Sequence, residues 1–157
     1  MGDAVLSLGL LAVLGCLLLA AGIEDARRRT ISNWTNLAVA LLAPVWWYAQ
    51  GYALWPDVPV QLLLAAIALG VFAGMFALGA MGGGDVKLIA ALALWLPLAP
   101  FMSLLIVMSI VGGGVTVLLM IERRWRRGEG VLEVPYGVAI AIAGLLALRE
   151  PIINQLA

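Results

Sequence analysis

Long apolar runs, separated by short charged, proline-containing or glycine-rich stretches, are the feature that most restricts the fold of this 157-residue chain. A helix needs about 20 apolar residues to cross the hydrocarbon core of a bilayer, because it rises 1.5 Å per residue. The segments predicted to be helical are residues 4–23, 34–48, 58–80, 86–96, 101–121 and 136–148. Pro97 and Pro100 separate the fourth segment from the fifth. We therefore predict an all-α, polytopic membrane bundle of about six transmembrane segments.

Composition places this bundle in a lipid bilayer. Hydrophobic residues make up 64% of the chain and charged residues 11%, a balance that would not keep a water-soluble domain of this size in solution. A cationic cluster follows the first apolar run instead of preceding it, so we interpret this run as a retained span and not as a secretory signal. The formal net charge of zero gives no information about nucleic acid by itself, and we expect no nucleic-acid partner for a chain of this kind.

The positions of the basic residues predict the orientation of the bundle. Alternating six spans places eight of the nine Lys and Arg residues on one side and only Arg149 on the other. Because basic residues accumulate on the cytoplasmic side, we predict that both termini face outward. The aromatic residues expected to form a belt at the outer interface are Trp46, Trp47, Tyr48, Tyr52 and Trp55.

Residues that the chain lacks narrow its chemistry. It contains no histidine, which excludes HExxH zinc proteases, Ser-His and Cys-His hydrolases and histidine proton relays. Cys16 is the only cysteine, so an internal disulfide, a CxxC redox pair and a cysteine metal cluster are excluded as well. Catalysis is left to carboxylates or to a Ser-Lys pair that uses the single lysine, Lys87. We expect neither a metal nor a cofactor.

Two aspartates adjoin apolar segments, where an ionisable side chain is costly and points to function. Asp25 follows the first segment, and Asp85 lies between the third and the fourth, sixty positions later. The predicted topology places both at the cytoplasmic side. Two carboxylates that approach closely share one proton, so one can act as a base toward water while the other donates to a scissile carbonyl. Taken singly, Asp85 could instead cap the fourth helix, and Asp25 could pair with Arg28 or Arg29.

Three glycines, Gly82, Gly83 and Gly84, come directly before Asp85. Glycine leaves room for a peptide to lie against the main chain, so we predict that the triplet admits a substrate backbone. A helix that begins near Asp85 would place this carboxylate at a positive helix end. We therefore expect Asp85 to be the ionised member of the pair.

The sequence around both aspartates resembles the type IV prepilin peptidase family, whose members are GxGD membrane aspartyl proteases. Residues 25–33 (DARRRTISN) are similar to the family's first motif, an aspartate and a basic residue followed by Ile-Pro-Asn. Residues 82–88 (GGGDVKL) match the second motif, GxGDxKL. Residues 135–137 (PYG) match a later Pro-Tyr-Gly pattern, so the resemblance covers nearly the whole chain.

The resemblance implies a single integral-membrane peptidase domain over residues 1–157, in the bacterial inner membrane and with its active site facing the cytoplasm. The implied catalytic residues are Asp25 and Asp85. The residues implied to support them or to bind substrate are Gly82, Gly83, Gly84, Lys87, Asn33, Pro135, Tyr136 and Gly137. The implied substrate is a prepilin or pseudopilin with a basic leader that is cut after glycine, and the small size is similar to Flp-type (Tad) members.

Two departures from the family pattern affect these expectations. Ser32 stands where the family usually has proline, which alters the turn predicted after the first span. The paired-cysteine insert of the bifunctional members is missing, so we do not expect this chain to methylate the new N-terminus with S-adenosylmethionine.

Two other functions are consistent with the same residues. Lys87 with Ser32, Ser103 or Ser109 would form a Ser-Lys protease, although Ser103 and Ser109 lie away from the cytoplasmic junction. Alternatively, the two aspartates bind a cation or carry protons in a small transporter or a pilus-assembly subunit. Whether the chain forms a homo-oligomer, and whether the two carboxylates are close without substrate, is left open by the sequence.

Overall fold

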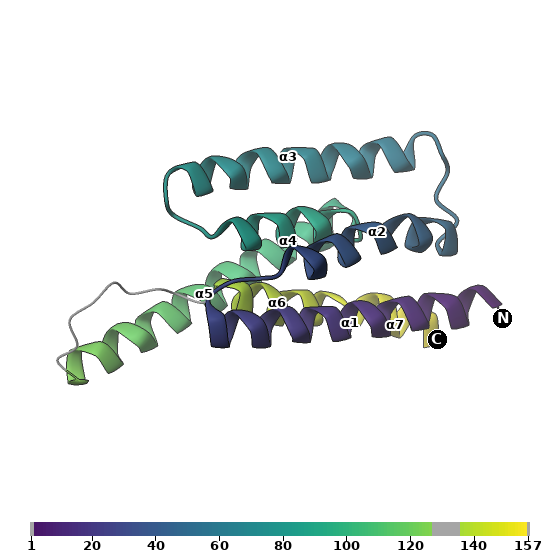
Figure 1. Cartoon of the computed structure of the whole chain (residues 1–157). Coiled ribbons are helices and arrows are strands. Elements are labelled where there is room, and N and C mark those ends of the chain that lie inside the picture. The colour runs from purple at the N-terminus through teal and green to yellow at the C-terminus, as the bar shows by residue number, and fades with distance from the viewer. Residues whose placement is uncertain (1, 127–135, 157) are drawn as a thin grey trace.

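The structure, a computed structural model, describes residues 2–126 and 136–156, and its regular elements are all α-helices (Figure 1). They are α1 (Gly2–Arg28), α2 (Asn33–Ala49), α3 (Asp57–Ala77), α4 (Gly83–Ala93), α5 (Leu98–Arg126), α6 (Tyr136–Ala147) and α7 (Arg149–Leu156). The predicted all-α fold is confirmed, and each predicted segment lies largely on one of the first six helices. The last helix was not predicted, because its residues do not form an apolar run.

Within the described residues, four helical stretches are long and apolar enough to cross a membrane. They are Ala4–Arg28, Asp57–Ala77, Leu98–Glu122 and Tyr136–Ile153. The chain is therefore a helical membrane bundle. Helices α2 and α4, with 17 and 11 residues, are shorter than a full span requires, so their crossing of the bilayer remains a prediction.

Helix α1 continues beyond the predicted end of the first segment. Arg27 and Arg28 occupy its last turn, where positive charge is favourable beside the negative end of the helix dipole. Asp25 therefore lies inside the helix and not after it, which corrects the boundary expected from hydropathy.

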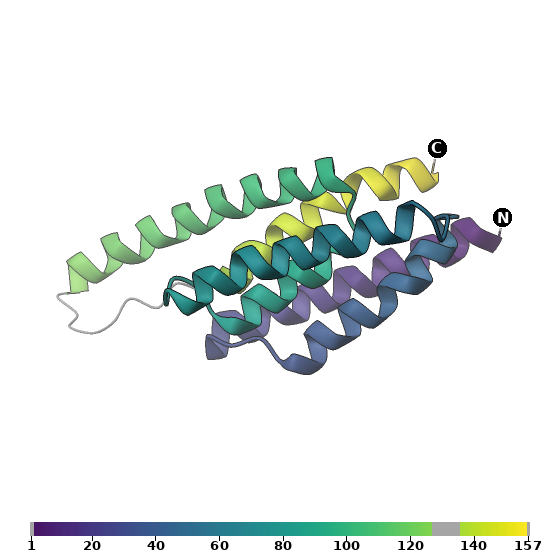
Figure 2. The same cartoon turned by 90° about the horizontal axis from the view of Figure 1, so that it is seen from above.

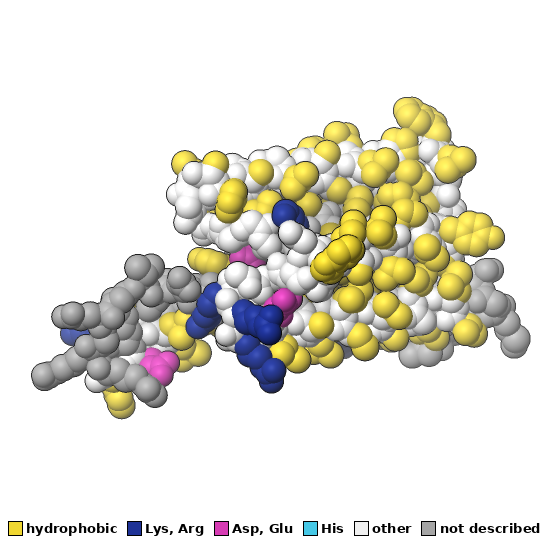
Figure 3. Space-filling model, in the orientation of Figure 1, with side chains coloured by type: hydrophobic (Ala, Val, Ile, Leu, Met, Phe, Trp, Pro, Cys, Tyr) yellow, Lys and Arg dark blue, Asp and Glu magenta, His cyan; other side chains and the backbone are white. Residues whose placement is uncertain are grey.

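The charged and glycine-rich segments lie at one end of the bundle, where several helices begin or end. Figures 1 and 2 show both termini together at the opposite end, as the predicted topology requires. The carboxyl end of α1 and the amino ends of α2, α4 and α6 meet away from the termini. Basic side chains gather where α1 ends, whereas hydrophobic side chains cover most of the rest of this face (Figure 3).

Helix α4 forms the centre of the core and packs against α2, α3 and α6. Leu88, Ile89 and Ala93 are fully buried, and a short, mostly apolar helix is stable only when neighbours cover it. The predicted break after α4 is confirmed. Pro97 directly precedes α5 and Pro100 lies in its first turn, where the missing N–H has no helical partner to lose.

Indole and amide side chains bind the carbonyl groups at the end of α4, which would otherwise lack partners in lipid. Trp47 Nε1 donates to Leu94 O at 2.7 Å, and Gln61 Nε2 donates to Ala93 O at 2.6 Å. Trp46 stacks on Trp95 with ring centroids 5.6 Å apart. Trp46 and Trp47 are therefore buried in the core, and the prediction that they belong to an interfacial belt is wrong.

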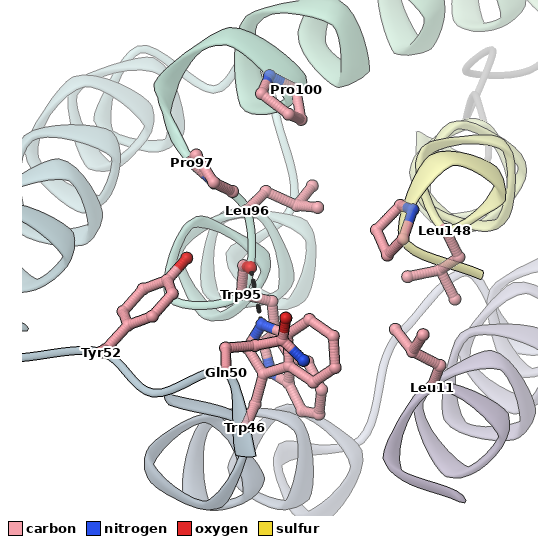
Figure 4. A pocket seen from close by; sticks show the side chains of 10 residues that line it. Leu11, Trp46, Gln50, Tyr52, Trp95, Leu96, Pro97, Pro100 and Leu148 are labelled. Atoms are coloured by element: carbon pink, nitrogen blue, oxygen red, sulfur yellow. Dashed lines mark hydrogen bonds between the residues drawn. The ribbon is translucent and has the colours of Figure 1, made fainter. Parts of the chain in front are cut away.

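A cavity of about 210 Å³ lies beside this tryptophan pair (Figure 4). Leu11, Gln50 and Leu148 line it together with the stacked indoles. Leu11 precedes Asp25 by fourteen residues on the same helix, which corresponds to roughly 21 Å. The cavity is therefore separate from the aspartates.

Candidate active site

Asp25 joins α1 to the beginning of α6. Its side chain is buried, with 4% exposure, and its Oδ2 accepts a hydrogen bond from the backbone N–H of Val138 at 3.2 Å. Val138 belongs to the first turn of α6, where N–H groups have no acceptor within the helix. Asp25 thus serves as an N-terminal cap for a helix more than a hundred residues later in the chain.

Gly137 allows α6 to approach this carboxylate. A Cβ atom at Gly137 would lie 2.8 Å from both Cβ and Cγ of Asp25 and 2.7 Å from Cδ1 of Ile31. Tyr136 packs on α5, because a Cβ at Gly112 would lie 3.5 Å from its ring. Two residues of the predicted Pro-Tyr-Gly pattern are thereby located, and Pro135 lies outside the described residues.

Asp85 is the third residue of α4, and Gly82 is the N-cap of this helix. The carboxylate turns back toward Gly82, as the acidic residue of a capping box does, and the Gly82 N–H lowers its pKa. A Cβ at Gly82 would lie 2.9 Å from Asp85 Oδ2. Glycine at position 82 therefore permits the carboxylate to fold over the start of its own helix.

The fold places both aspartates at the junction of α1, α4 and α6, because Ile31 lies against Gly84, which precedes Asp85, and against Gly137, which lies beside Asp25. Asp85 lies outside the candidate membrane spans and is 8% exposed. Burial raises the pKa of Asp85 to about 6, and the negative charge of Asp25 adds to this rise, although the Gly82 N–H opposes it. Burial and Asp25 thus outweigh the helix end in their effect on the pKa of Asp85, and which of the two carboxyl groups is the ionised member remains a prediction.

The other two glycines of the triplet, Gly83 and Gly84, pack against other residues of the protein. A Cβ at Gly84 would lie 3.1 Å from the backbone oxygen of Ile31, and one at Gly83 would lie 3.4 Å from the ring of Phe76. Asn36 Nδ2 donates to Gly84 O at 3.0 Å. The space beside Gly84 is thus taken by Ile31, whereas Gly82 is exposed at the surface. Admission of a substrate backbone remains a prediction, and Gly82 suits it best.

Lys87 and Asn33 are joined to each other by a hydrogen bond of 2.8 Å from Nζ to Oδ1. They line an open groove of about 510 Å³ between α2, α3 and α4. Residues 85 and 87 diverge by about 200° around a helix, so this groove lies on the other face of α4 from Asp85. A supporting role for this pair would therefore act through α4 and not by contact with the carboxylates.

The structure does not support a Ser-Lys pair. The Ser103 and Ser109 hydroxyls donate to carbonyl oxygens of their own helix, at 3.2 and 2.8 Å. The Ser32 hydroxyl accepts from the backbone N–H of Trp34 at 3.1 Å. Each of the three candidate serines is thus bound elsewhere, and Lys87 is bound to Asn33.

Sequence reasoning missed two residues that contact this site. Ile31 is buried between Gly84 and Gly137, and the Glu24 side chain accepts a hydrogen bond from the Ser32 N–H at 2.9 Å. One signal was available in the sequence for Glu24. A serine in place of proline gains an N–H group, and a partly buried N–H requires an acceptor.

Comparison with known proteins identifies the family. The profile of the type IV leader peptidase family matches residues 12–117, which is more than half of the chain. This range includes Asp25, Asp85 and the glycine triplet, and it ends before α6. Neither the curated proteins nor the solved structures that were compared give a match. The chain therefore belongs to the type IV leader peptidase family, a family of peptidases, and is a multi-pass membrane protein.

Proposed function

We propose that this chain is an aspartic leader peptidase that uses Asp25 and Asp85 to activate one water molecule. The observation that carries the proposal is the burial of two carboxyl groups, sixty positions apart in sequence, at the junction of α1, α4 and α6, where the charge of Asp25 acts on Asp85. The charge of one carboxylate makes it costly to ionise the other, so the pair holds one proton below about pH 6.

The environments of the two groups suggest their roles. Asp25, whose Oδ2 accepts the Val138 N–H, acts in this proposal as the base that takes a proton from water. Asp85 carries the shared proton and donates it to the carbonyl oxygen of the scissile peptide bond. When the tetrahedral intermediate collapses, the proton on Asp25 passes to the leaving amine. Asp85 takes back its proton from the hydroxyl group that forms when it protonates the carbonyl oxygen. The cycle thus leaves the pair as it began.

The proposed substrate is a prepilin, with an Flp-type prepilin as the first choice because the chain is small. Its basic leader would lie in the cytoplasm, and the cut would fall after a glycine near the membrane surface. The basic cluster where α1 ends supports a cytoplasmic position for this end of the bundle (Figure 3). A small transporter or pilus-assembly subunit is the alternative function, and the family match favours the peptidase.

The proposal is tested with the purified chain in liposomes and a synthetic Flp-type prepilin. We expect one cut after the glycine that ends the leader, identified by the mass of the mature product. A prepilin with valine at that glycine serves as the control and should remain uncut. Proton uptake into the liposomes without any cleavage would instead support the transporter.

The pH dependence of cleavage should follow the proton on Asp85. With a pKa raised to about 6, this carboxyl is neutral below that pH and charged above it. Cleavage should therefore fall as pH rises through this range and approach a tenfold loss per pH unit well above it, at about pH 7 to 8. Initial rates at prepilin concentrations well below KM, which report the pKa values of the free enzyme, measure this limb, and a rate that climbs over the same range would contradict the assignment of Asp85 as the acid.

A further inference from the structure

The turn between α1 and α2 lies against the glycines that neighbour the two aspartates, Gly84 before Asp85 and Gly137 beside Asp25. It begins at Arg29, which has a φ of 56°, in the left-handed region that residues other than glycine seldom adopt. The Arg29 N–H donates to the backbone oxygen of Asp25 at 2.8 Å and so ends α1. The turn is therefore attached to the residue that carries the first carboxylate.

Ile31 lies at the centre of this turn and touches both sides of the site. Its backbone lies against Gly84, which precedes Asp85, and its Cδ1 atom lies against Gly137, beside Asp25. It is buried, with 7% exposure. A shift of Ile31 would therefore change how α4 and α6 sit relative to each other, and with them the separation of the carboxyl groups.

Glu24 holds the turn in place through Ser32. The Ser32 N–H donates to Glu24 Oε2 at 2.9 Å, across eight residues. The backbone of Ser32 has φ −60° and ψ 138°, which are angles that proline adopts without strain. The family pattern places proline here, and proline has no N–H for such a bond.

We propose that Glu24 is a positioning residue that, through Ser32 and Ile31, sets the separation of Asp25 and Asp85. The charge-assisted hydrogen bond from Ser32 to Glu24 does in this chain what a rigid proline ring would do at position 32. This inference rests on the proposed two-aspartate function. It assigns Glu24 no contact with substrate.

The test is a double-mutant cycle between Glu24→Ala and Ser32→Pro, read as prepilin cleavage by membranes with matched protein levels. With Ser32 present, Glu24→Ala should lower kcat about tenfold and leave KM within about twofold, because the hydrogen bond is lost but no substrate contact changes. With Ser32→Pro present, adding Glu24→Ala should change kcat less than about twofold, since the ring holds the turn. Equal losses in both backgrounds would overturn the inference.

Two conservative variants separate this role from simple stability. Glu24→Gln keeps a neutral acceptor for the Ser32 N–H and should restore most of the kcat lost in Glu24→Ala. Ser32→Ala removes the hydroxyl that caps α2 but keeps the N–H, so its kcat should stay near wild type. A loss in Ser32→Ala as large as that in Glu24→Ala would assign the effect to the cap and contradict the positioning role.

Asp25→Asn and Asp85→Asn run alongside this cycle to distinguish the two ways it can fail. If either asparagine variant still cleaves at the normal rate, the proposed two-aspartate function is wrong, whatever Glu24 does. If both are inactive while Glu24→Ala keeps full kcat, the function stands and the positioning role of Glu24 is refuted.

Discussion

Asparagine at Asp25 or at Asp85 is expected to lower prepilin cleavage by at least about a thousandfold, within the range lost when a positioned acid or base is removed. Asparagine at 25 still offers an oxygen to the Val138 N–H, so α6 keeps its cap, but it cannot take a proton from water. Asparagine at 85 resembles the neutral acid in shape but cannot supply its proton. Cleavage per unit of membrane protein, with levels checked by immunoblot, measures both losses.

Asp57→Asn provides the matched control for these two variants. Asp57 is an exposed aspartate at the start of α3, and its Oδ2 accepts the backbone N–H of Ala53 at 2.9 Å. The same change of chemistry at this position should leave cleavage within about twofold of the wild-type rate.

The variant that carries both Asp25→Asn and Asp85→Asn should be no worse than either alone, because the pair acts as a unit. Independent, multiplying losses would contradict a shared proton.

Hydropathy predicted the helices well because lipid imposes one strong requirement, an apolar run of sufficient length. It failed where polar residues remain helical or where aromatic residues face inward. Helix α1 continues through Glu24 and Asp25, and α7 forms without an apolar run. Tryptophan is a residue type that is enriched at membrane interfaces, but Trp46 Nε1 donates to Trp95 O at 3.2 Å, and this bond permits its burial.

The two aspartates could be identified from the sequence because charge beside an apolar run is rare and the topology placed both at one end. Their ionisation could not be predicted from the sequence, since it depends on burial and on the distance between two segments that are sixty positions apart. The prediction for Asp85 considered the end of α4 alone and so omitted the larger effects of burial and Asp25. Ile31 stands at the isoleucine of the first motif, but its contacts could not be predicted, because a buried isoleucine in a turn looks like any other apolar residue until its neighbours are known.

Gly137→Ala is expected to lower cleavage about a hundredfold, a loss comparable with that from moving a catalytic group by about 1 Å. The new methyl group would lie 2.8 Å from Asp25 Cβ and Cγ, so α6 or the carboxylate must shift. The Cδ1 atom of Ile31, at 2.7 Å, can move more easily, because it is the end of a flexible side chain. The shift therefore falls mainly on Asp25 and on its hydrogen bond to Val138.

Gly113→Ala is the control that makes this result specific. Gly113 also lies in a helix, α5, but a Cβ there meets nothing within 4 Å, so alanine should be tolerated and should favour the helix slightly. We expect Gly113→Ala to cleave at the wild-type rate and Gly137→Ala to be present in the membrane at a similar level but nearly inactive. Full activity of Gly137→Ala would mean that close approach of α6 to Asp25 is not needed for cleavage, and that α6 contributes only to packing.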